Sequence, residues 1–171
     1  HIRFMYYIAS MTRGKFWAAV AALVFGLAPA WPHHGSTGVY NFSRPFYVEG
    51  IVSKAEYAFP HAEILVETGL SELPPALPDL SRISAAEGRD TGALLRVVPE
   101  APMVMISFDG TLTGRINGHA ARPRAGDRVR AIVYRRDSRD RYLGEYRVMM
   151  IELGNGEQLV LGRRAYFREL G

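Results

Sequence analysis

Three of the five histidines lie in one short stretch of the sequence, and their spacing could form a metal site. His33 and His34 are adjacent, and His61 follows Pro60 at the end of an alternating segment. If that segment is a strand, the histidine pair and His61 lie toward its two ends, which permits a shared site. Neutral imidazole suits Cu(II) and Zn(II), and no cysteine is present to favour Cu(I). We therefore predict copper or zinc binding by His33, His34 and His61, with Glu49, Glu63 or His119 as further candidate ligands.

Each of these residues also has a simpler interpretation. A histidine pair near the N-terminus that cleavage of a leader creates is often part of a flexible tail. A histidine at a corner between strands can simply hydrogen-bond a carbonyl group. His61 and Asp127 could form an acid–base pair, but a Gly-Asp dipeptide before a strand is usually a turn whose carboxylate accepts backbone N–H groups. The chain has no nucleophile elbow, phosphate loop, CxxC pair or HExxH helix. We therefore predict that the protein is not an enzyme.

The first thirty residues have the composition of an export signal. A short basic stretch at 11–15 precedes an apolar run of twelve residues at 16–27, and Ala28-Pro-Ala30 fits a small-x-small cleavage site. The apolar run is shorter than the ~20 residues that a membrane helix needs, so cleavage after Ala30 is the expected outcome. These features predict a periplasmic or secreted protein, with residues 1–30 as leader and signal peptide.

Composition limits the classes of partner. The chain has 171 residues, of which 48% are hydrophobic and 22% charged, as in an ordinary globular domain. Of its 21 basic side chains, three lie in the leader (Arg3, Arg13 and Lys15), which leaves 18 basic against 17 acidic side chains. A nucleic-acid binder needs a basic surplus for phosphate contacts, so we expect no nucleic-acid partner. Without cysteines, the hydrophobic core must hold the fold unaided.

The most basic stretch of the remaining chain runs from Arg135 to Arg141. Its arginines could bind phosphate or an anionic lipid. However, Asp137 and Asp140 are interspersed with them and cancel much of the positive field. This pattern favours a solvated hairpin tip.

The rest of the sequence has the pattern of short strands separated by turns. A strand is expected from Phe46 to Tyr57, ended by Phe59-Pro60 because proline cannot donate to a ladder, and a returning strand over 61–68. The pattern resumes at 103–108, 111–116, 128–134, 143–153 and 158–161, with Asp109-Gly110 as a hairpin turn. Turns at intervals of roughly eight to twelve residues predict an all-β fold. We expect a small antiparallel OB-like barrel or sandwich, preceded by an N-terminal signal helix.

A proline-rich stretch interrupts this series of strands. The segment 71–80 cannot sustain a strand or a long helix, although 80–87 could form a helical turn or two. A loop of this length is either a functional lid or a disordered insertion, and disorder or loose packing is the expectation. The expected organisation is a leader at 1–30, an N-terminal extension at 31–45 that ends in a turn, and one barrel domain at 46–171 with a proline-rich insertion at 69–102.

Several of these pieces form an ordered set: His33-His34-Gly-Ser, Glu49-Gly-Ile-Val, Tyr57-Ala-Phe-Pro-His61 and the Gly126-Asp127 turn. In this order, over about residues 33–162, they resemble a family of small exported bacterial proteins known only as a domain of unknown function. Its members typically show His-His-Ser, a Gly-x-Val strand, Trp-x-Asn-Pro-His and a Pro-Gly-Asp turn. The resemblance implies a periplasmic β-barrel and no established activity. This chain departs from the pattern at Tyr57, Phe59 and Ala125.

These features together predict an exported, non-catalytic binding or accessory protein that binds Cu(II) or Zn(II) through histidines. Its partner would be a metal ion or a periplasmic protein. The alternative is a structural accessory subunit of a membrane or periplasmic complex, anchored by an uncleaved N-terminal helix. Contact with a membrane is expected only in that second case.

Overall fold

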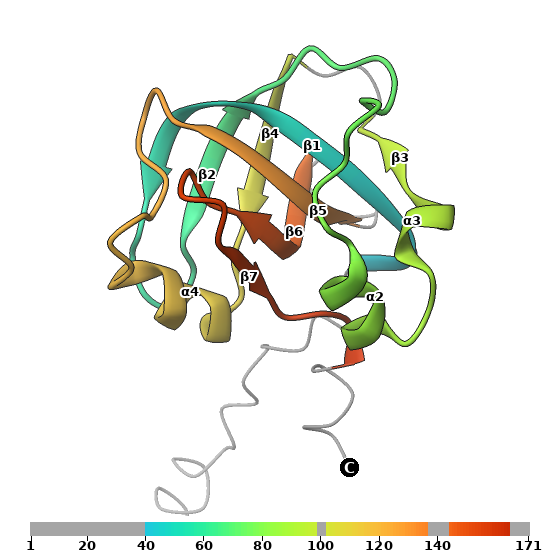
Figure 1. Ribbon diagram of the computed structural model, residues 1–171. Coiled ribbons are helices and arrows are strands. Elements are labelled where there is room, and N and C mark those ends of the chain that lie inside the picture. Colours follow the sequence, from blue (N-terminus) through green and yellow to red (C-terminus); the bar gives the residue numbers. More distant parts are fainter. Residues whose placement is uncertain (1–39, 99–101, 137–143, 165–171) are drawn as a thin grey trace, which may run out of the picture. The chain divides into compact units, whose positions relative to one another are not determined.

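The computed structural model describes residues 40–98, 102–136 and 144–164. Strands and short helices alternate along this part of the chain (Figure 1). In chain order they are β1 (Tyr40–Glu56), β2 (Glu63–Glu67), α2 (Ser81–Glu87), α3 (Thr91–Leu94), β3 (Arg96–Val97), β4 (Met103–Ser107), α4 (Gly110–Asn117), β5 (Arg128–Arg136), β6 (Glu145–Glu152) and β7 (Gln158–Val160). In these residues no helix is both long enough and apolar enough to cross a membrane.

Five of the strands close a barrel, which confirms the predicted all-β, OB-like fold (Figure 1). Strand β1 pairs antiparallel with both β2 and β5, β2 pairs with β4, and β5 pairs with β6. The ring is completed by β4 and β6, which run parallel, so the prediction of a purely antiparallel barrel is wrong at this seam. Outside the ring, β3 adds parallel to β1 and β7 adds antiparallel to β6.

Strand β1 is long because its first part pairs with β5 and its second part pairs with β2. Its 17 residues pair with β5 over 45–51 and with β2 over 51–56, with a register shift after Val52. Gly50 lies where the end of β2 approaches this strand, and a Cβ atom there would be 2.0 Å from the carbonyl oxygen of Glu67. The strand begins at Tyr40, so the turn predicted over 40–45 is wrong and this segment is the first part of β1.

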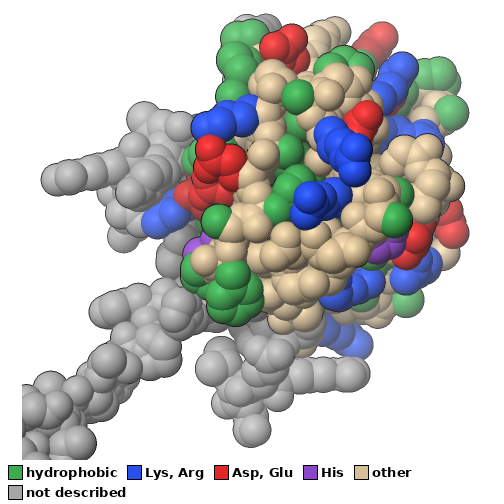
Figure 2. All heavy atoms as spheres, turned by 90° about the vertical axis from the view of Figure 1, so that its left-hand side faces the viewer, with side chains coloured by type: hydrophobic (Ala, Val, Ile, Leu, Met, Phe, Trp, Pro, Cys, Tyr) green, Lys and Arg blue, Asp and Glu red, His purple; other side chains and the backbone are tan. Residues whose placement is uncertain are grey.

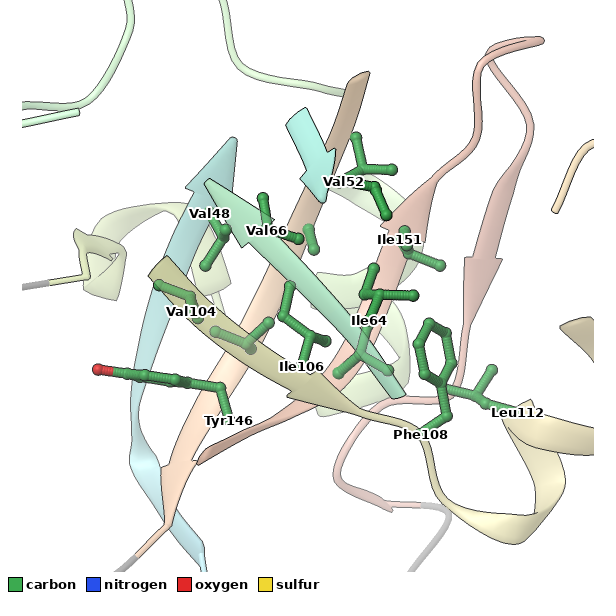
Figure 3. Close-up of a cluster of buried hydrophobic side chains, with 14 of the residues drawn as sticks. Val48, Val52, Ile64, Val66, Val104, Ile106, Phe108, Leu112, Tyr146 and Ile151 are labelled. Carbon is green, nitrogen blue, oxygen red and sulfur yellow. The ribbon is translucent and has the colours of Figure 1, made fainter. Parts of the chain in front are cut away.

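The barrel interior is filled by apolar side chains from every strand of the ring (Figure 3). Ala62, Ile64 and Val66 are at most 1% exposed, as the alternation in this segment predicted. Burying an aliphatic side chain of this kind contributes about 1.5–3 kcal/mol, so packing of the interior is the main stabilising factor. Tyr146 and Phe46 close one end, with their rings edge to face and their centroids 5.9 Å apart.

The proline-rich insertion is an ordered layer on the outside of the barrel. Residues 70–98, called the cover below, pack on the outer face of β1, β5 and β6, where Ile83 and Leu95 are buried against Ile132, Tyr134 and Met150. Disorder was therefore the wrong expectation for this segment. Prolines prevent long regular elements, but leucines at 70, 73, 77 and 80 pack against the same cluster and fix the path of the chain. Strands β5 and β6 are consequently buried on both faces.

The hairpin predicted after Asp109-Gly110 is wrong, because residues 110–117 form helix α4. Asp109 acts as the N-cap, and its carboxylate accepts a hydrogen bond from the backbone N–H of Leu112 at 2.7 Å. Leu112 and Ile116 then lie on one helical face, where both are fully buried. An Asp-Gly pair is both a turn signal and a helix start, and this spacing of apolar residues decides for the helix.

Candidate functional site

His61 lies at an exposed corner between β1 and β2, after a cis peptide bond between Phe59 and Pro60. Its Nδ1 atom is 3.2 Å from the carbonyl oxygen of Phe108. The next residue is held twice, because the Ala62 N–H donates to Thr113 Oγ1 at 2.9 Å and the Ala62 carbonyl accepts from the Phe108 N–H at 2.8 Å. The backbone around the imidazole is thus attached to the junction of β4 and α4.

The contact with Phe108 determines the chemistry of the ring. A carbonyl oxygen only accepts, so the His61 Nδ1 atom carries the proton and the lone pair of the neutral ring is on Nε2. Metal-bound histidines commonly have this arrangement, in which the N–H on one side donates to a backbone carbonyl and the other nitrogen is the ligand. The corner therefore presents an oriented imidazole of the kind that suits Cu(II) or Zn(II).

Most of the other candidate ligands are either outside the described residues or bonded to other groups. His33 and His34 lie outside the described residues. Glu63 is exposed and follows closely in sequence, at the start of β2. Glu49 instead accepts hydrogen bonds from the Tyr47 hydroxyl at 2.7 Å and from Arg128 Nε at 2.8 Å.

His119 is also engaged elsewhere. Its Nε2 atom is 3.1 Å from Glu157, and its Nδ1 atom accepts the backbone N–H of Ala121. It follows the C-terminal end of α4, whereas His61 contacts the segment before that helix, and eight helical residues span about 12 Å. Among the described residues, no group of three or more His, Cys, Asp and Glu side chains is placed to hold a metal ion.

Asp127 has the structural role that the Gly-Asp pattern indicated. Its carboxylate accepts the backbone N–H of Arg124 at 2.8 Å and closes the turn before β5. No hydrogen bond joins Asp127 to His61, and each has its own backbone partner. The hypothetical acid–base pair is therefore not assembled in the described structure.

Glu145 is buried where the parallel seam of the barrel closes. It accepts hydrogen bonds from the hydroxyl groups of Tyr40 and Ser107 and from Arg136 Nη1 at 2.5 Å. Burial alone would raise the pKa of Glu145, but these donors outweigh it and hold the pKa below its ordinary value. A carboxylate with its lone pairs occupied in this way holds strands together and is unsuited to general-base chemistry.

Glu87 is the second buried glutamate among the described residues, and it attaches the cover to the barrel. It accepts hydrogen bonds from the Tyr134 hydroxyl at 2.6 Å, from Arg89 Nε at 3.1 Å and from the backbone N–H of Arg163 at 2.7 Å. Arg89 also donates to the carbonyl oxygen of Phe42 at 2.6 Å. Contacts from β5, from the cover and from the segment after β7 thus meet at one carboxylate, and Arg89 links it to β1.

A hollow of about 660 Å³ lies between the beginning of the cover and the ends of β1, β3 and β5. Arg44, Arg96 and Arg135 line it together with Phe46 and Leu73. Sequence reasoning did not group these arginines, because they are far apart in the chain and follow no spacing pattern. Strand pairing and the path of the cover bring them together.

Charges on the outer surface are mixed. Figure 2 shows Lys and Arg side chains interspersed with Asp and Glu on one side of the barrel. On the outer face of β1 and β2, the exposed residues include Glu56, Glu63 and Glu67, with Lys54 paired to Glu56 at 2.5 Å. The expectation that nucleic acid is not a partner stays a prediction.

Comparison of the chain with family models, curated proteins and solved structures found no match. The resemblance to the exported bacterial family therefore stays a prediction. Function has to be inferred from the side chains and their contacts.

Proposed function

We propose that the protein is an exported, non-catalytic binding module that holds a Cu(II) or Zn(II) ion with His61 and the histidine pair His33 and His34. One observation carries this proposal: the hydrogen bond from His61 Nδ1 to the Phe108 carbonyl at an exposed corner. It orients the imidazole before any ligand arrives, which reduces the cost of binding. The histidine pair supplies the further nitrogen ligands that a stable site for either ion needs.

The non-catalytic part of the proposal is supported by the roles of the acidic residues. Glu145 and Glu87 hold strands and the cover together, Asp109 caps a helix, and Asp127 closes a turn. The barrel interior is packed with apolar side chains. Export is supported by the basic, apolar and small-residue pattern at 11–30 and by the near-neutral charge that remains without the leader.

The second candidate function is that of a structural accessory subunit of a membrane or periplasmic complex. It is favoured by Phe59, whose side chain is 76% exposed beside His61. An aromatic side chain presented at a rigid corner is a common anchor in protein interfaces. N-terminal sequencing of the protein from a producing bacterium separates the two candidates. A start near Trp31 favours the soluble binder, and a retained segment at 16–27 favours the anchored subunit.

The metal site is tested by calorimetric titration of the untagged full chain with Cu(II) and with Zn(II). The variants are His61→Ala and the double change His33→Ala/His34→Ala, with His119→Ala as the matched control because His119 pairs with Glu157. We expect stoichiometric binding that weakens about 100-fold or more in the first two variants, since even loss of an outer-shell partner costs about 10–100-fold. The control should bind as the wild type does.

Two results would change this conclusion. If the wild type binds no more tightly than either the His61→Ala variant or the double variant, the metal proposal fails and Phe59 becomes the starting point for a partner search. If only the double variant loses binding, the metal site belongs to the histidine pair alone and the corner has a structural role. Unchanged thermal unfolding midpoints would show that the variants are folded.

A further inference from the structure

Three arginines gather at the hollow between the cover and the barrel because of strand pairing. Pro45 of β1 pairs with Tyr134 of β5 in an antiparallel ladder, which places Arg44 and Arg135 next to that pair at the same end of it. Phe46, the next residue of β1, pairs with Arg96 of β3. Strand pairing thus brings three positively charged residues together around Pro45 and Phe46 of β1.

These charges are not neutralised within the part of the chain that the structure describes. Arg44, Arg96 and Arg135 are exposed, and their side chains make no ion pair or hydrogen bond to a described residue. Elsewhere the protein matches arginine with carboxylate, as in the pairs Arg89–Glu87 and Arg136–Glu145. Like charges on neighbouring strands are destabilising. An anion bound among the three arginines would relieve this repulsion and so stabilise the folded protein.

The shape and the walls of the hollow narrow the class of anion. Its volume of about 660 Å³ is within the ~300–1,000 Å³ typical of small-molecule sites. Phe46, Leu73 and Val97 form apolar walls beside the guanidinium groups. Arginine binds carboxylate and phosphate in a bidentate manner, and the apolar walls suit a carbon chain or ring attached to that group.

We propose that this hollow binds a small organic anion, with its carboxylate or phosphate held by Arg44, Arg96 and Arg135 and its apolar part lying against Phe46, Leu73 and Val97. Glu72 also lines the hollow. Its negative charge repels an anion and reduces the net positive charge of the site. This site is separate in composition from the His61 corner. Its ligand and its test are independent of metal binding.

Calorimetric titration of the full chain at low ionic strength provides the test. The probes are octyl phosphate below its micelle concentration, octanoate, inorganic phosphate and the neutral octyl glucoside. We expect octyl phosphate and octanoate to bind more tightly than inorganic phosphate, and octyl glucoside not to bind. Each of Arg44→Gln, Arg96→Gln and Arg135→Gln should weaken octyl phosphate by about tenfold, because a hydrogen bond to a charged group contributes about 1.5–3 kcal/mol.

Matched controls identify the site. Arg124→Gln removes an exposed arginine from the turn before β5 and should leave the affinity unchanged. Glu72→Gln should strengthen binding, because it removes the opposing charge. His61→Ala should bind octyl phosphate as the wild type does, which distinguishes this site from the proposed metal site.

A second measurement does not depend on the choice of ligand. If the three arginines repel one another, each glutamine variant should unfold about 1–4 °C higher than the wild type at low ionic strength, and the difference should vanish in high salt. The proposal is overturned if the triple variant Arg44→Gln/Arg96→Gln/Arg135→Gln binds octyl phosphate as tightly as the wild type does. It is also overturned if vesicles of phosphatidylglycerol bind but monomeric octyl phosphate and octanoate do not, since this would indicate a membrane surface contact.

Discussion

The two buried glutamates of the described structure, Glu145 and Glu87, have similar partners but hold different regions of the molecule. Glu145 at the barrel seam accepts from a tyrosine, a serine and an arginine, and Glu87 in the cover accepts from a tyrosine, an arginine and a backbone N–H. The partners of Glu145 come from β1, β4 and β5, all strands of the closed ring. Those of Glu87 come from the cover itself, from β5 and from the segment after β7.

This difference indicates which contacts the whole domain requires. The ring cannot open at Glu145 without separating strands whose other faces form the barrel core. The cover can detach at Glu87 while the ring stays closed, because no strand of the cover is part of the ring. In the described residues its strand pairing with the ring is limited to β3, and its other contacts are side-chain packing and hydrogen bonds. We infer that the seam belongs to the global unfolding unit and that the cover is a smaller cooperative unit of its own.

The largest expected effect is at the seam. Glu145→Gln removes the carboxylate that pairs with the largely buried Arg136, and breaking a buried ion pair from one side costs about 3–5 kcal/mol. We expect a loss of this order in the free energy of unfolding, measured by urea denaturation with tyrosine fluorescence and circular dichroism. Both probes should report one shared transition. A cost below about 1 kcal/mol would show that the seam does not depend on this carboxylate.

At the cover, Glu87→Gln should have a smaller and more local effect. Arg89 keeps its hydrogen bonds to the Phe42 carbonyl and the Tyr134 hydroxyl in this variant, so we expect a cost of about 1–3 kcal/mol. Amide hydrogen exchange followed by mass spectrometry should show faster exchange in 70–98, with little change in β2 and β4. Tyr134→Phe removes the hydroxyl group that donates to Glu87 and should be non-additive with Glu87→Gln. Equal acceleration in all barrel strands would contradict the idea of a separate cover.

Sequence pattern predicted the ring better than the cover for a physical reason. Alternation in segments such as Ala62–Val66 records which side of a strand is buried, and a barrel has one interior for all of its strands. The cover has no such period. Its position depends on leucines at irregular spacing and on Glu87, whose polar side chain is fully buried only because Tyr134 and Arg89 are there. A buried glutamate is unexpected from composition alone.

The candidate sites differ in the same way. His61 could be identified from the sequence because its position depends on a local feature, the Pro60-His61 corner at the end of a strand. The tautomer of His61 could not be predicted, because Phe108 follows β4 and reaches the corner through the long-range pairing of β2 with β4. The helix after it was moreover predicted as a hairpin. Arg44, Arg96 and Arg135 form a group only through the pairing of β1 with β3 and β5. No local pattern records such a group.

The smallest expected effect is the dependence of seam stability on pH. The folded-state pKa of Glu145 is below its ordinary value of 4.5, so its contribution to stability is present above that value and is lost as the pH falls from about 4.5 through the folded pKa. The slope from one carboxylate is at most about 1.4 kcal/mol per pH unit. Urea denaturation at several pH values should show a shallower acid loss for Glu145→Gln than for the wild type.

Glu49 provides a check on this pH dependence at a second place on the barrel. Burial would raise its pKa as well, but hydrogen bonds from Tyr47 and Arg128 lower it below the ordinary value, so Glu49→Gln should also reduce the acid loss. The two carboxylates share no partner, and their effects on the slope should add in the double variant. If Glu145→Gln keeps the full wild-type slope, acid sensitivity comes from elsewhere and the seam is held mainly by packing. If the double variant loses most of the slope, these two carboxylates are the acid-sensitive points of the ring.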